Sequence, residues 1–377
     1  MSPTFFNKEN EYQVTRYPAT NSRSLKAWNT ADEYLLQRLE EYQLSNVSIA
    51  IFNDRFGFLS CLLYDFSPII ILNYKSQKKA IIQNATDNLL KISDLRFQNP
   101  LDIFSEKINI GIFKIPKSLE LFRLQLFQLS QSLADDAVVL GAFMTKYFSP
   151  KIITIASEFF ENVEQSRAWK KSRLIILQKK KPFRNISITH TIAFEKDIYQ
   201  QYFGVFSAKN IDYASQFFIQ HWMIKKDVQR VLDLASGNGI LAKKIKEKNP
   251  SYEVHLMDDA YLAIESSRLN LTPEKETNPE KIFFHWNDTM DIFENDFFDL
   301  VVSNPPFHFE YETNIEVAIH LFQEVKRCLK NGGQFQLVAS RHLNFKTHLE
   351  KIFESVLVIL ENDKFIIYMA TDFPSVI

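Results

Sequence analysis

Short apolar runs alternate with amphipathic stretches through the second half of the chain. The runs have the length and the β-branched and aromatic content of buried strands, and the stretches between them place apolar residues at helical spacing. Strands that alternate with helices in this way indicate a mostly parallel, doubly wound α/β sheet. The predicted strands are 229–235, 252–259, 282–288, 297–304 and 334–340, and the predicted helices are 240–249, 260–271, 315–331 and 343–355.

Two details refine this pattern. The last apolar segment, 356–370, is broken by Glu361-Asn362-Asp363, and the break predicts an antiparallel hairpin at the end of the sheet. The chain has only eight glycines, so each one is expected at a position where the backbone conformation requires glycine. Gly332 and Gly333 follow the helix 315–331 and predict its C-terminal cap.

Length and composition set outer limits on the fold and its partners. The chain has 377 residues, of which 46% are hydrophobic, enough for two domains with separate cores. Its 44 Lys and Arg balance 45 Asp and Glu, which neither favours nor excludes a nucleic-acid partner, because binding requires only a local basic face. Cys61 and Cys328 lack the spacing of a zinc site, and we expect no metal.

The N-terminus has no basic start followed by an apolar core, and no apolar run reaches the ~18 residues of a membrane span. We therefore expect a cytoplasmic protein with no membrane partner.

Residues 229–248 have the strand–loop–helix pattern that opens a Rossmann-type nucleotide site. Gly237 and Gly239 allow the backbone to turn tightly and to approach a ligand. Asp258 ends the next strand, where a carboxylate grips two ribose hydroxyls. NAD enzymes share this spacing, and a tight turn without a ligand also fits it. Asp233, which can reach the amino end of S-adenosylmethionine (AdoMet), and the lack of a third glycine at the dinucleotide spacing favour AdoMet.

Three other segments of the chain are considered for contacts in the site. Asp288 follows the third strand and can accept a hydrogen bond from the adenine amino group, unless it is a solvated turn residue. Gly204, Phe206 and Ser207 can form a loop over the cofactor, unless Phe206 packs in the core. His308 fits a packing or loop role better than contact with substrate.

The strand 297–304 ends in Asn304-Pro305-Pro306-Phe307. Proline cannot donate to a sheet ladder, so the strand stops here, at the carboxyl edge where doubly wound sheets bind ligands. The side-chain carbonyl of Asn304 and the backbone carbonyl of Pro305 can each accept one N–H of an exocyclic base amine, which turns the nitrogen lone pair toward a methyl sulfonium. Pro306 adds rigidity and Phe307 can stack on the base. The pattern predicts methyl transfer to an amine.

The first half of the chain repeats the pattern in a weaker form. Residues 46–63 again show a strand, a turn and the start of a helix, with Gly57 as their one glycine. Residues 108–122 form a strand that meets a proline turn, but the loop is Lys114-Ile115-Pro116-Lys117, so a cation replaces the amine acceptor. The pattern indicates a duplicated methyltransferase fold whose first copy has lost its chemistry.

We therefore predict two tandem Rossmann-like class I methyltransferase domains. Residues 1–190 form the degenerate one, which binds RNA, and residues 191–377 the catalytic one, with the boundary near 185–200. The RNA hypothesis depends on residues 167–184, which carry eight basic residues and no acidic one, a composition suited to irregular or single-stranded RNA. A solvated strand edge protected by lysines is the alternative. The candidate RNA contacts are Trp169, Lys170, Lys171, Arg173, Lys179, Lys180 and Lys181.

Several stretches together resemble one family. In the second half they are "GVFS…ID…FF.QH", "VLDLASGNG", "SSRLN", "SNPPFH" and "VASRHLNF", and in the first half "TRYPATNSRSLKAWNTADEYLL", "IFNDRFGFLSC" and "AWKKSRLI". They are similar to the ribosomal RNA guanine-N2 methyltransferases, more closely to the type that acts on the large ribosomal subunit (RlmG type) than to the type that acts on the small one (RsmC type). The resemblance covers nearly the whole chain.

The resemblance implies AdoMet-dependent methylation of the N2 amine of guanine 1835 in 23S ribosomal RNA, protein-free or in an early precursor. The family has glycine and cysteine where this chain has Ala235 and Ser236. Alanine is small and requires only a negative φ, so we expect Ala235 to be tolerated beside the cofactor. The residues implied to bind AdoMet are Asp233, Gly237, Gly239, Asp258 and Asp288, and those implied to position the base are Asn304, Pro305, Pro306 and Phe307.

Other functions fit parts of the pattern. The same loop can serve guanine-N2 methylation of 16S ribosomal RNA, or methylation of adenine N6 in DNA or of a protein glutamine. Phe307 in place of tyrosine and the inert first half disfavour the DNA and protein substrates. A different class is a non-catalytic RNA-binding ribosome assembly factor that has lost AdoMet through Ala235. The intact loop at 304–307 argues against it.

Overall fold

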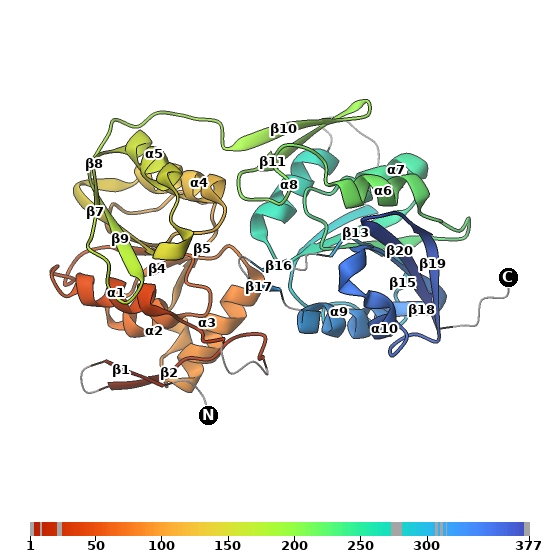
Figure 1. The fold of residues 1–377 in the computed structure, drawn as a ribbon, viewed down its shortest axis with the longest axis horizontal. Helices are drawn as coiled ribbons and strands as arrows, with labels where there is room; N and C mark the ends of the chain where they lie inside the picture. Colours follow the sequence, from red (N-terminus) through yellow and green to blue (C-terminus); the bar gives the residue numbers. More distant parts are fainter. Residues whose placement is uncertain are drawn as a thin grey trace. The chain divides into compact units, whose positions relative to one another are not determined.

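The computed structural model describes residues 4–7, 10–20, 25–272, 281–305, 308–309, 312–313 and 315–372. The chain divides into two compact units, unit 1 (Met1–Ile188) and unit 2 (Thr189–Ile377). Each unit contains a seven-stranded sheet with helices on both faces (Figure 1). No helix in the described ranges is both long enough and apolar enough to cross a membrane.

The two sheets have the same strand order. In spatial order, the strands of unit 1 are β5 (Arg96–Gln98), β4 (Ile69–Ile71), β3 (Ile49–Phe52), β6 (Ile108–Lys114), β7 (Leu133–Met144), β9 (Ser172–Lys180) and β8 (Phe160–Gln165). Those of unit 2 are β14 (Ile282–Trp286), β13 (Glu253–Asp258), β12 (Arg230–Leu234), β15 (Phe298–Ser303), β18 (Leu329–Ser340), β20 (Phe365–Thr371) and β19 (Ser355–Glu361).

Strand direction is also the same in the two sheets. The first five strands in each order are parallel, and the last two pair antiparallel. Even the register shift between the fourth and fifth strands recurs, at Ile108/Ile110 and at Phe298/Leu300. The predicted doubly wound sheet, its end hairpin and the duplication of the fold are confirmed.

Two helical layers cover each sheet (Figure 1). In unit 1 they are α1 (Thr30–Leu39), α2 (Phe58–Leu62) and α3 (Lys75–Asp87) on one face, and α4 (Leu119–Ser130) and α5 (Pro150–Phe159) on the other. In unit 2 they are α6 (Tyr213–His221), α7 (Ile240–Lys248) and α8 (Tyr261–Leu271) on one face, and α9 (Ile315–Cys328) and α10 (Phe345–Leu349) on the other. Two-stranded hairpins are formed by β1 (Thr4–Asn7) with β2 (Asn10–Gln13), β10 (Thr189–Phe194) with β11 (Asp197–Tyr202), and β16 (His308–Phe309) with β17 (Glu312–Thr313).

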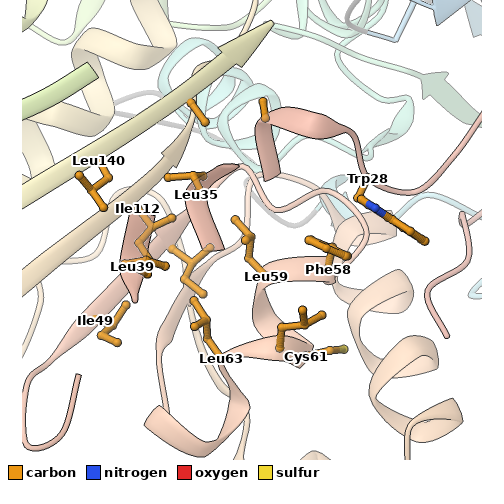
Figure 2. Close-up of a cluster of buried hydrophobic side chains, with 14 of the residues drawn as sticks. Trp28, Leu35, Leu39, Ile49, Phe58, Leu59, Cys61, Leu63, Ile112 and Leu140 are labelled. Carbon is orange, nitrogen blue, oxygen red and sulfur yellow. The ribbon is translucent and has the colours of Figure 1, made fainter. Parts of the chain in front are cut away.

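Each sheet separates two hydrophobic cores, because successive side chains of a strand point to opposite faces. In β3, Ile49 and Ile51 lie in one core of unit 1 and Ala50 and Phe52 in the other. Figure 2 shows the first of these cores, in which Ile49 lies among side chains of α1 and α2. Burial on both faces explains why the central strands are continuous apolar runs and not alternating ones.

The predicted C-terminal cap at Gly332-Gly333 is wrong. The helix α9 ends at Cys328 and the strand β18 begins at Leu329, so both glycines lie within the strand. The Phe297 N–H donates to the Cys328 carbonyl at 2.8 Å, so the neighbouring chain segment satisfies a helix-terminal carbonyl that a glycine cap would otherwise serve. Gly332, with a φ of 77°, instead lies at the register shift of the sheet.

Candidate active site

The loop after β12 turns through left-handed backbone conformations at Gly237 (φ 56°) and Gly239 (φ 78°). A Cβ on Gly239 would come within 2.9 Å of the Leu271 side chain and 3.0 Å of Ser267 Oγ. A Cβ on Gly237 would meet no atom within 4 Å. Gly239 is therefore required by close packing on α8, whereas Gly237 brings bare backbone to an open space, as a ligand-binding turn does.

The premise of a negative φ at Ala235 is wrong, because its φ is 61°, while its tolerance beside the cofactor stays a prediction. A left-handed conformation costs a residue with a Cβ about 1–2 kcal/mol. The conformation persists because the N–H groups of Ala235 and Ser236 both donate to the Met257 carbonyl, at 2.8 and 3.2 Å. The loop therefore carries local strain at this position.

Replacing Ala235 with glycine is expected to raise the free energy of unfolding by about 1 kcal/mol, because glycine adopts this conformation without strain. Urea denaturation measures the change. The matched control is Ala242→Gly, in the helix α7, which is expected to lower the same quantity by about 1 kcal/mol. Equal destabilisation by both substitutions would contradict the strain at Ala235.

Asp233 is fully buried near the end of β12. Its Oδ2 accepts a hydrogen bond from the Ala242 N–H at 3.0 Å. Within the described residues its Oδ1 has no partner, and neither does the buried Oγ of Ser236. Burial, with a smaller contribution from Asp258, raises the pKa of Asp233 to about 7. Two buried polar atoms beside the glycine loop thus have no hydrogen-bond partner in the described part of the chain.

Asp258 ends β13, and both of its oxygens hold backbone groups of the site. Oδ2 accepts from the Gly237 N–H at 2.9 Å and Oδ1 from the Ala260 N–H at 2.8 Å. These bonds fix the carboxylate, and each oxygen keeps a lone pair for a further donor. Burial raises the pKa of Asp258 to about 6. Asp288 is half-buried and follows β14, the strand next to β13.

Phe206 is 75% exposed, so the alternative that it packs in the core is wrong. Its carbonyl accepts from Gln201 Nε2 at 3.2 Å, and Gln201 Oε1 accepts from Asn238 Nδ2 at 2.9 Å. Asn238 lies between the two glycines of the loop after β12. The segment that carries Phe206 is therefore tied to the glycine loop, while its contact with a cofactor stays a prediction.

Asn304 directly follows β15 and is held by two side chains. Its Nδ2 donates to Asp212 Oδ2 at 2.8 Å and to Ser215 Oγ at 2.9 Å. Before it, Ser303 Oγ donates to the Leu234 carbonyl at 2.7 Å, which fixes the end of β15 against β12. Pro305 is buried. Two predicted site residues, Pro306 and Phe307, lie outside the described residues, as does the side chain of His308.

Sequence reasoning missed Asp212 and Ser215 as site residues. Asp212 is the N-cap of α6 and accepts from the N–H groups of Ala214 and Ser215, at 3.0 and 3.3 Å. An aspartate before an apolar-periodic segment is a recognisable cap signal. Nothing in the sequence, however, placed this cap beside Asn304.

At the corresponding edge of the unit 1 sheet, the side chains form hydrogen bonds with neighbouring groups of the same edge. By sheet register, the counterparts of Ala235, Gly237 and Asn304 are Asn53, Arg55 and Lys114. Arg55 donates to Ser76 Oγ at 2.7 Å, where Gly237 leaves open space. Asn53 Nδ2 donates to the Lys114 carbonyl and to Gln125 Oε1, each at 2.9 Å. Side chains here take the hydrogen bonds that a cofactor would need, which agrees with the predicted loss of chemistry.

The basic stretch 167–184 does not form one patch. Trp169 and Ser172 bridge the turn before β9, and Lys170 and Lys171 form its tip in left-handed conformations. Lys170 Nζ lies 4.3 Å from the centroid of the Trp169 ring, and both lysines are exposed. This basic tip (Trp169, Lys170 and Lys171) combines an aromatic surface with two cations.

Lys179, Lys180 and Lys181 lie at the other end of β9, about 25 Å away for a strand of this length. Lys180 Nζ donates to the Leu133 carbonyl at 2.7 Å, and Lys181 Nζ donates to the Ser157 carbonyl at 2.6 Å. These two ammonium groups fix the local fold. Arg173 is half-buried on the strand itself.

Two family models match successive parts of the chain. The RLMG N-terminal domain matches residues 2–181 and the Methyltransferase small domain matches residues 198–369. The ribosomal RNA large subunit methyltransferase G of Yersinia pseudotuberculosis serotype O:1b (strain IP 31758) is 30% identical over 354 residues, which cover 93% of this chain and 89% of the relative. That of Pseudoalteromonas translucida (strain TAC 125) is 29% identical over 366 residues, which cover 96% of each chain.

A solved structure with a similar fold is the T. thermophilus 16S rRNA N2 G1207 methyltransferase (RsmC), in complex with AdoMet and guanosine. Its TM-score is 0.76 at 17% identity, and the match covers 99% of this chain and 98% of that chain. At this identity the likeness bears on the fold alone. It confirms the predicted pair of Rossmann-like class I methyltransferase folds.

Proposed function

The chain belongs to the ribosomal RNA large subunit methyltransferase G family, and on this premise we propose that it transfers a methyl group from AdoMet to the N2 amine of a guanine in 23S ribosomal RNA. The observation that carries the proposal is the orientation of Asn304. Both hydrogens of its amide are donated within the protein, so Oδ1 is the atom that an incoming amine meets. Guanine 1835, the target that the resemblance implies, is the guanine we propose.

The residues at the carboxyl ends of β12 and β13, and in the loop after β12, fit AdoMet. Asp233 Oδ1 and Ser236 Oγ are buried polar atoms without a partner in the described part of the chain, and Gly237 faces open space. Asp233 would hold the amino group, Asp258 the ribose hydroxyls and Asp288 the adenine amine, and Phe206 would lie over the site. AdoMet, when bound, supplies an electrophilic methyl group.

The loop after β15 would orient the amine. Asn304 Oδ1 and the Pro305 carbonyl each accept one of its N–H groups, which localises the nitrogen lone pair and directs it to the cofactor. Pro306 would stiffen the loop and Phe307 would stack on the base. Two fixed acceptors are sufficient for this task, and no strong general base is required, because the methylated ammonium loses its proton readily.

The RNA presents the amine only when the guanine leaves its helix. A paired guanine must be flipped out, at a cost that is least in an unstructured RNA. The substrate we propose is therefore protein-free 23S RNA or an early precursor.

The basic tip of unit 1 would bind the RNA. The double change Lys170→Gln/Lys171→Gln is expected to reduce the slope of log K against log salt by about 1.4–1.8, at about 0.7–0.9 per phosphate contact. Trp169→Ala is expected to weaken binding by about tenfold with an unchanged slope, because base stacking is uncharged. Filter binding to a 23S fragment at several salt concentrations measures both.

The matched control for the tip is Lys180→Gln/Lys181→Gln, which removes the same charge from the other end of β9. We expect it to lower thermal stability and to leave the salt slope unchanged. A slope that changes equally in the two double variants would contradict binding at the tip and favour a general effect of charge.

The test of the function is methyl transfer from tritiated AdoMet to unmodified 23S and 16S RNA, followed by digestion and identification of the labelled nucleoside. Label in N2-methylguanosine of 23S RNA alone is the expected result. Label in 16S RNA, or in another nucleoside, would overturn the assignment of substrate. No AdoMet binding, together with no transfer to either RNA or to whole ribosomal subunits, would favour the assembly-factor alternative.

A further inference from the structure

The start of α6 and the end of β15 share one hydrogen-bond network. Asp212 Oδ2 accepts from the Asn304 amide at 2.8 Å and also from the first N–H groups of α6. Ser215 Oγ, which is buried, accepts the second amide hydrogen of Asn304 at 2.9 Å. Helix and strand are far apart in sequence, so the network fixes a contact that chain connectivity does not.

This network selects one orientation of the Asn304 amide. In the flipped orientation Oδ1 would face the carboxylate of Asp212, and two acceptors would oppose each other at hydrogen-bond distance. The Asp212 charge also strengthens the bond it accepts. The amide therefore has one stable setting, in which Oδ1 is free of the network and is available as an acceptor.

Unit 1 contains the same contact with different residues. Lys114, the counterpart of Asn304, forms an ion pair with the buried Asp32 at 3.0 Å. Asp32 lies in the first turn of α1, as Asp212 lies at the start of α6. An acidic residue at this helix terminus thus holds the residue at the carboxyl end of the fourth strand in both units, Lys114 as the last residue of β6 and Asn304 directly after β15. In unit 2, the held residue is an amide with one free acceptor.

We propose that Asp212 and Ser215 are positioning residues for methyl transfer, which act by orienting the Asn304 amide toward the substrate amine. This inference rests on the proposed function of Asn304. It predicts that loss of the network lowers kcat and leaves the affinity for AdoMet and for RNA unchanged, because neither side chain needs to touch either ligand. A purely structural role would instead lower stability and all three quantities together.

The test separates capping from positioning at Asp212. Serine caps a helix about as well as aspartate, but its oxygen is one bond nearer the backbone and falls short of Asn304. Asp212→Ser is expected to lower kcat about tenfold, the effect of one charge-assisted hydrogen bond. Asp212→Asn keeps an oxygen at the full reach and loses only the charge, so it is expected to restore most of that loss.

Ser215→Ala removes the second acceptor and is expected to lower kcat about threefold. The double variant Asp212→Ser/Ser215→Ala releases the amide altogether and is expected to lose about a hundredfold. Gln220→Ala, an exposed position of the same helix, is the control and is expected to behave as wild type. Single-turnover assays with saturating AdoMet and 23S RNA, calorimetric AdoMet titrations and thermal melts supply the measurements.

A double-mutant cycle decides whether the two residues act through Asn304. In an Asn304→Ala background, Asp212→Ser is expected to cause no further loss of kcat. A further tenfold loss there, or an unchanged kcat in Asp212→Ser/Ser215→Ala, would overturn the positioning role while wild-type transfer to 23S RNA continues. If the wild-type protein transfers no methyl group, the proposed function fails instead, so the two failures are distinguishable.

Discussion

Replacing Asn304 with alanine is expected to lower kcat for methyl transfer to 23S RNA by about 10³-fold, the upper range for loss of one preorganised electrostatic contact. The Asn304 Oδ1 is one of the two acceptors available to the amine, and without it the nitrogen lone pair stays delocalised in the base. The affinity for AdoMet is expected to stay within about twofold of wild type, because the cofactor contacts follow other strands. Single-turnover kinetics and calorimetry measure the two quantities.

The matched comparison is Asn304→Gln, which keeps the amide and moves it by one methylene. Geometric placement within a fraction of an ångström matters for such acceptors, so the glutamine variant is expected to lose at least about a hundredfold in kcat. Near-normal activity in Asn304→Gln would contradict a role that depends on the amide's position. An equal loss of AdoMet affinity and of kcat in both variants would point to a collapsed loop.

The cofactor side of the site is largely predictable from sequence because local rules generate it. A glycine loop after an apolar strand, with an aspartate at the end of the next strand, places Gly237 and Asp258 together in any doubly wound sheet, and their bond of 2.9 Å follows.

The substrate side of the site, around Asn304, depends on contacts between segments that are distant in the sequence, and no local sequence pattern encodes such contacts. The contact of Asp212 with Asn304 joins the start of α6, which precedes β12 in the sequence, to the end of β15. A composition count over 167–184 likewise could not show that its lysines lie at both ends of one strand. The conformation of Ala235 was missed because hydrogen bonds to Met257 override the preference of alanine for a negative φ.

Local predictions also failed where tertiary contacts end an element. The helix predicted over 343–355 is limited to α10, Phe345–Leu349, with Phe353 buried beyond its end. Apolar periodicity continues through this segment because its side chains still face the core. Periodicity reports which side chains are buried, and the backbone need not stay helical to bury them.

Replacing Asp233 with asparagine is expected to lower AdoMet affinity by about a hundredfold, since a buried charged hydrogen bond to the cofactor's amino group is lost. The same change is expected to raise the free energy of unfolding of the cofactor-free protein at pH 8 by up to about 4 kcal/mol, at about 1.4 kcal/mol for each unit by which the pKa of Asp233 is raised. Burial raises the pKa of Asp233 to about 7, so the free protein loses stability as pH rises from about 4 through 7 and the buried carboxyl ionises. Asparagine can still accept the Ala242 N–H and carries no charge.

The affinity for AdoMet is also expected to depend on pH through Asp233. Wild-type AdoMet affinity is expected to rise between pH 5 and about 7, as Asp233 and Asp258 ionise, by no more than about tenfold per unit for each proton released. In Asp233→Asn, only the part of this pH-dependent rise in affinity that is due to Asp258, whose pKa is raised to about 6, is expected to remain. The control is Asp299→Asn, at the other end of β15, whose carboxylate accepts from the backbone N–H of Arg230 and from Lys330 Nζ. It is expected to destabilise the protein without changing AdoMet affinity. If Asp233→Asn also lowers the free energy of unfolding, as the control does, the carboxylate of Asp233 stabilises the fold. A gain in stability together with a loss of AdoMet affinity shows that the buried charge is retained to bind the ligand.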